Sequence, residues 1–338
     1  MKIAINGFGR IGRAVFKIIL KKYPDLELVA INDLSDSTVL AHLLRYDSLY
    51  GTYENRAKAD NDTIFIDGTS TGRKVALFSE RDPENLPWKK MGIDIVLECT
   101  GIFRDYDGAN KHIKAGAKKV IISAPSKSPE KIASYIIGVN ENEIDYSSDI
   151  FDIGSCTTNC LAPILNILNN NYGVEKGFIT TIHSYTNDQK LLDISHSDLR
   201  RARAAAINII PTSTGAAKAI GRVIPSLEGK IDGISLRVPT PTVSLLDLFC
   251  ELKEGTTKED LNYIFKKSSL EEKYSGILGV EDAPLVSSDY VGSSFSSIID
   301  SSLTMANKKL VKVVSWYDNE WGYSCRLADF TNLISNKI

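Results

Sequence analysis

The first half of the chain alternates short β-prone runs with segments of helical hydrophobic spacing. Four β-prone runs occur there, at 2–5, 26–31, 93–100 and 118–123. After the first run, apolar residues recur every three or four positions, at Ile11, Val15, Ile18 and Ile19. Because strands that alternate with helices pair in parallel, residues 1–155 are predicted to form an α/β domain with a mostly parallel sheet.

The second half has a different pattern, in which long β-rich runs follow one another with few helices between them. A helix is predicted at 161–173, and the β-rich runs lie at 177–185, 231–240, 243–252 and 309–318. Strands without intervening helices favour antiparallel pairing, so residues 156–318 are predicted to form an α+β domain with a mainly antiparallel sheet. Thr257 and Asp260 have the spacing of a capping box, which predicts a further helix from about Thr257.

Three glycines follow the first β-prone run and open the first helical segment. Gly7, Gly9 and Gly12 match the dinucleotide-binding fingerprint, and Asp33 follows the second run, where the ribose-binding acid is expected. Such glycines let the backbone approach a pyrophosphate, and the helix N-terminus favours the anion. A carboxylate at Asp33 accepts hydrogen bonds from ribose hydroxyls and repels a 2′-phosphate. The pattern therefore predicts a Rossmann-type domain that binds NAD in preference to NADP.

Composition narrows the class of protein. Hydrophobic residues make up 43%, charged residues 24%, and the formal net charge is −2, so nothing in the charge balance favours nucleic acid or an anionic membrane. No run approaches the ~20 apolar residues of a membrane span, and Asn6 interrupts the N-terminus before a signal-peptide core could form. Five cysteines without a repeating spacing do not indicate a disulfide framework, so a cytoplasmic location is expected.

The stretch SCTTNC (155–160) holds two of these cysteines, Cys156 and Cys160. No second close pair of ligands accompanies them, as a zinc site requires, and their spacing differs from the C-x-x-C of redox pairs. If a helix begins near Cys156, its free amides and dipole are expected to lower the pKa of that thiol. Cys160 then lies one turn further, among apolar residues, and is expected to be buried. Cys156 is therefore the candidate nucleophile.

A cysteine nucleophile needs a base, and the chain holds four histidines. His183 ends a β-rich run directly before a polar stretch, where a strand can hold a side chain in a site. We predict it as the base, with His196 as the alternative. His112 lies in a charged helix-like stretch and is expected to be solvated, and His42 is expected to be packed or at the surface.

Arginines gather in one segment of the second half. Arg200, Arg201 and Arg203 precede the Thr-Ser-Thr-Gly turn at 212–215. Each alone is typical of a surface ion pair, but guanidinium groups beside hydroxyls and a glycine amide also fit a phosphate pocket. Arg237 lies in an apolar β-rich run and needs an anionic partner more than a surface arginine does.

Together these residues resemble the phosphorylating glyceraldehyde-3-phosphate dehydrogenases. The motifs that carry the resemblance run nearly end to end, in the order of that family: INGFGRIGR (5–13), AHLLRYDS (41–48), SCTTNCLAP (155–163), HSYTNDQ (183–189), DLRRARAAA (198–206), PTSTGAAKA (211–219), RVPTP (237–241) and SWYDNEWGY (315–323). The resemblance implies oxidation of D-glyceraldehyde 3-phosphate to 1,3-bisphosphoglycerate with reduction of NAD. Cys156 would form a hemithioacetal and then a thioester, and His183 would act as the base before inorganic phosphate attacks.

The resemblance also implies roles for further residues. Thr186 and Arg237 would hold the C3 phosphate of the substrate, and Arg201 would lie near both phosphates. The attacking phosphate would be held by Ser155, Thr157, Thr214 and Gly215. Cofactor contacts would come from Arg10, Ile11, Asp33, Arg81, Ser123 and Asn319. The family is homotetrameric, and its C-terminal segment, here 319–338, returns to the cofactor domain as a helix.

The chain departs from the pattern of the family at two places. Ile194-Ser195 stands where many strictly NAD-dependent members have Leu-Pro, and a serine there resembles members that accept NADP. NAD is thus expected as the main cofactor, with tolerance of NADP. Asp152-Ile153-Gly154 replaces the usual Ser-Asn-Ala before the cysteine, which is expected to change packing more than chemistry.

Other functions fit these residues less well. Erythrose-4-phosphate dehydrogenase is a sister activity, against which HSYTNDQ argues, and a dehydrogenase using both NAD and NADP is a second alternative. A binding protein without turnover has no use for Cys156 together with His183. A cysteine hydrolase has no use for the glycine fingerprint and Asp33.

Overall fold

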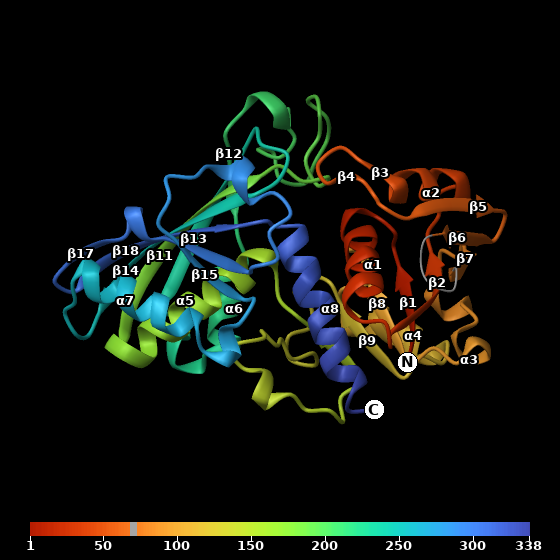
Figure 1. Ribbon diagram of the computed structural model, residues 1–338, viewed down its shortest axis with the longest axis horizontal. Helices are drawn as coiled ribbons and strands as arrows, with labels where there is room; N and C mark the ends of the chain where they lie inside the picture. The colour runs from red at the N-terminus through yellow and green to blue at the C-terminus, as the bar shows by residue number, and fades with distance from the viewer. Residues whose placement is uncertain (68–72) are drawn as a thin grey trace. The chain divides into compact units, whose positions relative to one another are not determined.

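The computed structural model describes residues 1–67 and 73–338 and divides them into two units (Figure 1). The first unit comprises Met1–Ser134, Ile144–Ile153 and Ser324–Ile338, and the second comprises Tyr135–Glu143 and Gly154–Tyr323. These units differ from the predicted domains in three places, the first of which is the boundary, at Gly154 instead of Cys156. Tyr135–Glu143 joins the second unit because Ile136 packs in its core. The last segment of the first unit begins at Ser324, so Asn319 belongs to the second unit.

An eight-stranded sheet forms the first unit, in the order β10-β9-β8-β1-β2-β7-β6-β5. The strands are β1 (Lys2–Asn6), β2 (Glu27–Asn32), β5 (Arg56–Asp60), β6 (Thr63–Asp67), β7 (Arg73–Phe78), β8 (Ile95–Glu98), β9 (Lys119–Ile122) and β10 (Ile150–Asp152). From β10 to β7 all neighbours pair in parallel, which confirms the predicted mostly parallel sheet. The strand order reverses at β1, and ligands of such sheets bind outside the carboxyl ends of the strands at that point.

Helices accompany these strands in the first unit: α1 (Arg10–Lys22), α2 (Ser37–Arg45), α3 (Trp88–Met91), α4 (Tyr106–Lys114) and most of α8 (Trp321–Ser335). The rings of Phe151 and Phe330 lie 5.9 Å apart and join α8 to β10. Among the helices of the described residues, none combines the length and the hydropathy that a membrane crossing needs.

The antiparallel part of this sheet, from β5 to β7, was not predicted from the sequence. In β5 the sequence RAKAD alternates exposed charges with half-buried alanines. Alanine and aspartate are poor strand formers, so the hydrophobic pattern gave no strand signal there. A short hairpin of β3 (Tyr46–Asp47) and β4 (Gly51–Thr52) precedes it.

A second sheet forms the other unit, in the order β12-β13-β11-β14-β18-β16-β15, with β17 paired to β18. Its strands are β11 (Val174–Ser184), β12 (Ile210–Ser213), β13 (Ile231–Val238), β14 (Ser244–Leu252), β15 (Leu278–Glu281), β16 (Ser297–Asp300), β17 (Met305–Asn307) and β18 (Leu310–Tyr317). Most neighbours are antiparallel, which confirms the expected type of sheet. The pairs β11–β13 and β15–β16 are parallel exceptions.

One face of this second sheet is covered by α5 (Cys156–Tyr172), α6 (Ala216–Val223) and α7 (Lys258–Ser269) (Figure 1). Leu161 and Leu165 of α5 pack with Leu246 and Leu248 of β14 in its core. Thr257 caps the predicted helix, since its Oγ1 accepts a hydrogen bond from the Asp260 amide at 3.1 Å.

Short 3-10 turns occur in both units, at Pro83–Asn85, Glu141–Glu143, Ala205–Ile207, Pro225–Leu227, Glu272–Tyr274, Ser287–Tyr290 and Ser301–Leu303.

Candidate active site

Cys156 is the first residue of α5, and the residues before it hold it there. The Ser155 side chain caps the helix, since its Oγ accepts a hydrogen bond from the Thr158 amide at 3.0 Å. Gly154 has φ +66°, a left-handed conformation that favours glycine, and its carbonyl accepts a hydrogen bond from the Tyr323 hydroxyl at 3.0 Å. The glycine of the unusual Asp-Ile-Gly sequence therefore adopts the turn that leads into the helix without the strain that a side chain would bring.

His183 lies beside Cys156, near the C-terminal end of β11. Its Nε2 is 3.5 Å from Cys156 Sγ, within the reach of a thiol–imidazole pair. The side chain is buried, and its ring faces that of Tyr317 edge-on, with 6.1 Å between the centroids. His196, the alternative base, instead places Nε2 3.4 Å from a carboxylate oxygen of Asp188. The geometry thus favours His183 as the partner of the cysteine.

The pKa of Cys156 corrects one prediction from the sequence. Burial raises the pKa of this thiol, although Arg237 and Thr157 act in the opposite direction. The position at a helix N-terminus was expected to lower that pKa, but removal of the sulfur from water outweighs the helix amides. Cys156 is therefore a thiol at neutral pH in this state, and a base must take its proton.

Burial has the opposite effect on the histidine. Together with the nearby Arg237, it lowers the pKa of His183 to about 3. The imidazole is therefore neutral at neutral pH, which is the protonation state that a base requires.

Arg237 lies next to His183 because β11 and β13 pair in parallel with these two residues in register. Its Nη1 is 2.6 Å from His183 Nδ1 and donates a hydrogen bond to the Ser184 carbonyl at 3.0 Å. Burial lowers the pKa of the guanidinium, and among the described residues no carboxylate forms an ion pair with it. A cation withdrawn from water without an acidic partner favours an anion at this place.

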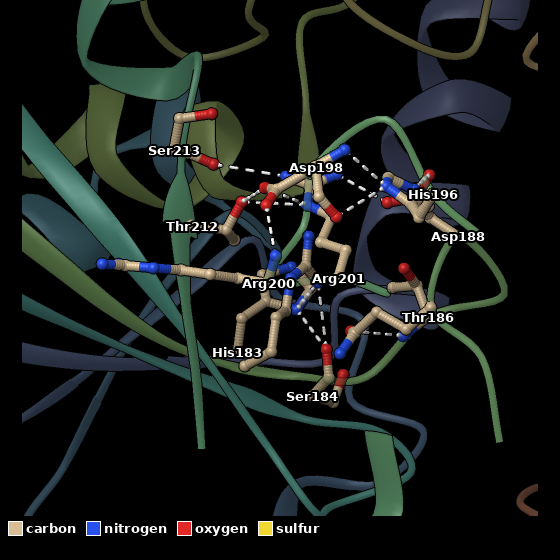
Figure 2. Close-up of polar contacts among 12 residues, drawn as sticks. His183, Ser184, Thr186, Asp188, His196, Asp198, Arg200, Arg201, Thr212 and Ser213 are labelled. Carbon is tan, nitrogen blue, oxygen red and sulfur yellow. Dashed lines mark hydrogen bonds and ion pairs between the residues drawn. The ribbon is translucent and has the colours of Figure 1, made fainter. Parts of the chain in front are cut away.

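Arg201 is held by a polar cluster in the segment that leads to β12 (Figure 2). Its Nε donates to Thr212 Oγ1 at 2.9 Å, and its Nη1 lies 2.5 Å from a carboxylate oxygen of Asp188. Burial raises the pKa of Asp188, but the contacts with Arg201 and His196 together lower it by more. The pKa of this carboxyl is therefore below its ordinary value. After burial and Arg237, the positive charge of Arg201 also lowers the pKa of His183. Arg200 and Arg203 are exposed, and Arg203 pairs with Asp193 at 2.8 Å.

The hydroxyl residues predicted for phosphate binding have varied surroundings. Thr157 is buried, and its hydroxyl lies 2.9 Å from the Tyr317 hydroxyl, while Ser155 is used as the helix cap. Thr214 Oγ1 accepts a hydrogen bond from the Ala216 amide at 3.3 Å, and Gly215 precedes α6 with open space around it. The Thr186 amide donates to Gln189 Oε1 at 3.3 Å. Among the described residues, no direct contact joins Thr186, Thr214 or Gly215 to the cysteine.

In the first unit, each of the three glycines after β1 has a different structural role. Gly7 has φ +89°, and a Cβ there would lie 2.7 Å from the Thr100 amide nitrogen. A Cβ on Gly12 would lie 2.2 Å from the Gly7 carbonyl oxygen, so this glycine allows the helix to pack on the strand. A Cβ on Gly9 would meet nothing within 4 Å, which leaves space at the start of α1. A turn glycine, an open glycine and a packing glycine are what a dinucleotide pyrophosphate requires.

Asp33 follows β2 and ties that strand to the glycine loop. Its Oδ2 accepts a hydrogen bond from the Phe8 amide at 2.8 Å, and its Oδ1 accepts one from the Ser35 amide at 2.9 Å. A groove of about 520 Å³ beside it is lined by Leu34, Asp36, Leu77 and Phe78, among others. Apolar side chains and the carboxylates of Asp33, Asp36 and Asp62 line this groove together, so it offers both a surface for a base and acceptors for ribose hydroxyls.

The remaining cofactor candidates of the first unit differ in how they are held. Arg10 begins α1, pairs with Asp47 at 2.8 Å and lies over the Tyr50 ring. Ile11 is half-buried in the first turn, Ser123 follows β9 at the carboxyl edge of the sheet, and Arg81 is exposed.

Asn319, in the second unit, has a fixed orientation. Its side-chain carbonyl oxygen accepts hydrogen bonds from Ser184 Oγ at 2.9 Å and Ser244 Oγ at 3.0 Å. Ser184 follows His183 directly, so the amide of Asn319 is anchored next to this histidine.

A buried polar network at the carboxyl ends of β1 and β8 was missed from the sequence. His112 was expected to be solvated, but it is fully buried: Trp88 Nε1 donates to its Nδ1 at 3.0 Å, and its Nε2 is 3.1 Å from Glu98 Oε2. Glu98 also accepts a hydrogen bond from Asn6 Nδ2 at 2.5 Å. The charged residues around His112 in the sequence concealed its inward orientation. Cys160 is buried as predicted, and Cys250 and Cys325 are buried as well, whereas Cys99 is only partly buried.

Within residues 1–67 and 73–338, no group of three or more histidine, cysteine, aspartate or glutamate side chains is arranged to hold a metal ion.

Comparisons with known proteins agree with this geometry. Residues 1–106 match the family model described as glyceraldehyde 3-phosphate dehydrogenase, NAD binding domain, and residues 155–319 match the model of the C-terminal domain of the same family. The chain belongs to the glyceraldehyde-3-phosphate dehydrogenase family. A relative with that name from Borreliella burgdorferi is 50% identical over 97% of this chain and 98% of its own length. Glyceraldehyde-3-phosphate dehydrogenase 2 of Trichormus variabilis is 51% identical over 100% of this chain and 99% of its own length.

Membership in the glyceraldehyde-3-phosphate dehydrogenase family agrees with the two folds and with the cofactor. The NAD-binding model covers the glycine loop and Asp33, so NAD is the cofactor of this chain, and the three glycines fit its pyrophosphate. The chloroplastic glyceraldehyde-3-phosphate dehydrogenase B of Pisum sativum is 53% identical over 100% of this chain and 74% of its own length.

Proposed function

We propose that the chain catalyses the phosphorylating oxidation of D-glyceraldehyde 3-phosphate to 1,3-bisphosphoglycerate with NAD. The observation that carries this proposal is the pair of Cys156 Sγ and His183 Nε2, 3.5 Å apart at the start of α5. Membership in the glyceraldehyde-3-phosphate dehydrogenase family and the fit of the glycine loop to a dinucleotide support it. The relatives named above do not favour the erythrose-4-phosphate alternative.

In the proposed reaction, His183 Nε2 takes the proton of Cys156, the sulfur adds to the aldehyde carbon, and the imidazolium returns the proton to the carbonyl oxygen, which gives a hemithioacetal and a neutral imidazole. NAD, when bound, accepts a hydride from that carbon. The same imidazole takes the proton of the hemithioacetal hydroxyl, which leaves a thioester on Cys156. Inorganic phosphate then attacks the thioester carbonyl, and the sulfur leaves as a thiolate, so that the acyl phosphate is released.

The reaction requires the binding of two phosphate groups. Arg237 and Arg201 are the arginines proposed to bind them, and both act on the pKa of His183. Arg237 and Thr186 are proposed to hold the C3 phosphate, with Arg201 near both anions. The attacking phosphate is proposed to bind at Ser155, Thr157, Thr214 and Gly215. Because the Thr157 hydroxyl contacts Tyr317, we assign the role of Thr157 to its backbone amide in the first turn of α5.

The cofactor is proposed to contact Arg10, Ile11, Asp33, Arg81, Ser123 and Asn319. The negative charge of Asp33 favours NAD over NADP, since it repels a 2′-phosphate. Ser195 lies exposed in the loop after β11 and remains the reason to expect some tolerance of NADP.

We propose that the chain forms a homotetramer, in which the uncovered face of the second sheet contacts another copy. Phe178, Ile234 and Phe249 project from that face and are 67%, 48% and 47% exposed. Phe178 and Phe249 are direct partners on β11 and β14, so they form one apolar patch. Such a patch on a sheet face is typical of contact with another copy of the chain. A cytoplasmic location stays a prediction.

One assay tests the proposed activity. NAD and NADP reduction should be measured separately with glyceraldehyde 3-phosphate, with and without inorganic phosphate. We expect phosphate-dependent turnover with NAD and a lower kcat/KM with NADP. Sustained turnover that does not depend on phosphate, or no turnover, would contradict the proposal, because the thioester would then have another fate or would not form.

A further inference from the structure

A buried carboxylate lies at the carboxyl end of β8, the strand that pairs with β1. Glu98 Oε1 accepts hydrogen bonds from the Thr100 amide at 2.7 Å and from the Thr100 hydroxyl. Its Oε2 accepts one from Asn6 Nδ2 at 2.5 Å and lies 3.1 Å from His112 Nε2. Within residues 1–67 and 73–338, no lysine or arginine pairs with Glu98. This carboxylate therefore depends on its hydrogen bonds, as a buried charge must.

Trp88 decides how His112 meets this carboxylate. An indole N–H can only donate, and it is directed at His112 Nδ1 at 3.0 Å. Nδ1 therefore accepts, so the proton of the ring is on Nε2 and is donated to Glu98 Oε2. The 3.3 Å between Asn6 Nδ2 and His112 Nε2 follows from their donation to the same oxygen. All polar contacts of the Glu98 side chain are thus donors, which suits a carboxylate, because an ionised carboxyl group only accepts.

The chain of hydrogen bonds continues from Glu98 across further strands of the sheet. Asn6 Oδ1 accepts a hydrogen bond from Asn32 Nδ2 at 2.7 Å. Asn32 also binds the backbone of Glu80: its Nδ2 donates to the Glu80 carbonyl at 2.9 Å, and its Oδ1 accepts from the Glu80 amide at 2.8 Å. Because a backbone amide can only donate, it fixes the orientation of both asparagine side chains. The ends of β8, β1 and β2 and the segment after β7 are thereby joined.

The members of this chain directly precede residues of the proposed cofactor site. A Cβ on Gly7 would lie 2.7 Å from the Thr100 amide nitrogen, the group that Glu98 binds. A change at Glu98 therefore reaches the glycine loop directly, and it reaches the adenosine side through the two asparagines. The neighbouring pairs are Asn6 and Gly7, Asn32 and Asp33, and Glu80 and Arg81.

We propose that Glu98 is a positioning residue of the NAD site. Its carboxylate, held by His112, fixes the strand ends that contact the dinucleotide before the dinucleotide binds, so that binding does not have to order them. Glu98 is buried and acts through the groups that it holds, Thr100 and Asn6. This inference rests on the part of the proposed function that assigns NAD contacts to these strand ends, and it does not depend on the reaction.

Glu98→Gln tests the proposal with the smallest change of shape. A glutamine offers one acceptor oxygen, whereas donors face both oxygens of the carboxylate. His112 cannot change its tautomer, because Trp88 donates to its Nδ1. The glutamine NH2 group is therefore expected to face the Thr100 amide, which loses its acceptor. We expect the affinity for NAD to fall about tenfold, measured by titration calorimetry of the full-length protein without substrate.

Val96→Ala is the matched control for a loss of stability alone. Val96 lies on the same strand, two residues before Glu98, and is fully buried in the core of the first unit. Its side chain is apolar and takes no part in the hydrogen bonds. The substitution should lower the melting temperature, because it leaves a cavity, but should not change the affinity for NAD. Equal NAD affinities of the two variants would overturn the inference.

Residue-resolved amide hydrogen exchange covers the case in which Glu98→Gln does not fold. In the wild type without NAD, the Gly7 and Thr100 amides should already exchange slowly, because they donate to the Asn32 carbonyl and to Glu98. NAD should protect them little further. Amides protected only after NAD is added would contradict the inference, since the cofactor would then order the strand ends. Failure of the proposed reaction is distinguishable, because it would appear as absent turnover with normal NAD affinity.

Discussion

At the scale of single residues, burial dominates the electrostatics of the catalytic pair. It raises the pKa of Cys156 and lowers that of His183, so both groups are uncharged at rest. Formation of the thiolate therefore has to be driven by a base and by bound ligands. Cys160, four positions along α5, is more deeply buried and lies beside the hydroxyls of Ser297 and Ser315, at 3.7 and 3.6 Å.

The two cysteines are expected to respond differently to the same substitution. Cys156→Ser should lower kcat for aldehyde oxidation by about a thousandfold or more, because a serine at this place is not ionised by the neutral His183. Cys160→Ser should keep most of the activity, since a hydroxyl fits among the two neighbouring serines. Steady-state kinetics would measure both, and NAD binding should be unchanged in each. Equal losses would mean that the nucleophile is misassigned.

The neutral, buried His183 also predicts how stability depends on pH. Its pKa is about 3 in the folded chain and 6.5 when exposed, so between these values only the unfolded chain binds the proton. The free energy of unfolding therefore falls as the pH decreases below about 6.5, by about 1 kcal/mol for this group down to about pH 5.5. His183→Gln should show a smaller decrease in urea denaturation, and His196→Gln should match the wild type. Identical pH dependence in all three proteins would contradict this.

At the scale of the elements, the glycines in the loop between β1 and α1 have two different roles. Two of them are needed for the backbone to pack, and one leaves space for a ligand. Gly7 and Gly12 are needed by the chain itself, because a Cβ at either would collide with backbone atoms. Gly9 is not needed for that reason, since the space beside it is open. The open position is the one that a pyrophosphate would occupy.

Substitutions in this loop should separate folding from cofactor binding. Gly12→Ala should destabilise the first unit severely, because its Cβ would lie 2.2 Å from the Gly7 carbonyl oxygen. Gly9→Ala should leave the melting temperature nearly unchanged but weaken NAD binding about tenfold or more, equivalent to about 1.4 kcal/mol. Calorimetry of unfolding and of NAD binding would measure both effects. Unchanged NAD affinity in Gly9→Ala would remove Gly9 from the cofactor site.

At the scale of the whole molecule, the uncovered face of the second sheet is the feature that a single chain does not explain. Helices α5 to α7 bury the opposite face, whereas Phe178 and Phe249 remain about half exposed or more. Contact with a second copy would bury these rings, at about 25 cal/mol for each Å² of apolar surface removed from water.

The proposed homotetramer can be tested on this face. Phe178→Glu should dissociate the assembly into smaller species, because each copy would bring a charge into the contact. Tyr263→Glu is the control, since Tyr263 is equally exposed, at 67%, but lies on α7. Light scattering after size-exclusion chromatography would measure the masses. Equal masses for the two variants would contradict a contact through this face.

The sequence by itself determined the class of fold and the candidate nucleophile, because these depend on local patterns. Hydrophobic periodicity separated the parallel from the antiparallel half. The N-terminal position of Cys156 on a helix and the identity of the glycine loop also followed from neighbours in the chain. Where local patterns were weak, as in the alanine- and charge-rich strand β5, the prediction failed.

The tertiary structure alone decided what depends on partners distant in the sequence. The register of β11 and β13 places Arg237 on His183, and the depth of α5 in its core sets the direction of the Cys156 pKa. His112 appears solvated in its charged segment and is buried because Trp88 and Glu98 meet it. Charge states and tautomers depend on burial and on such long-range contacts, and neither is encoded by the spacing of residues along the chain.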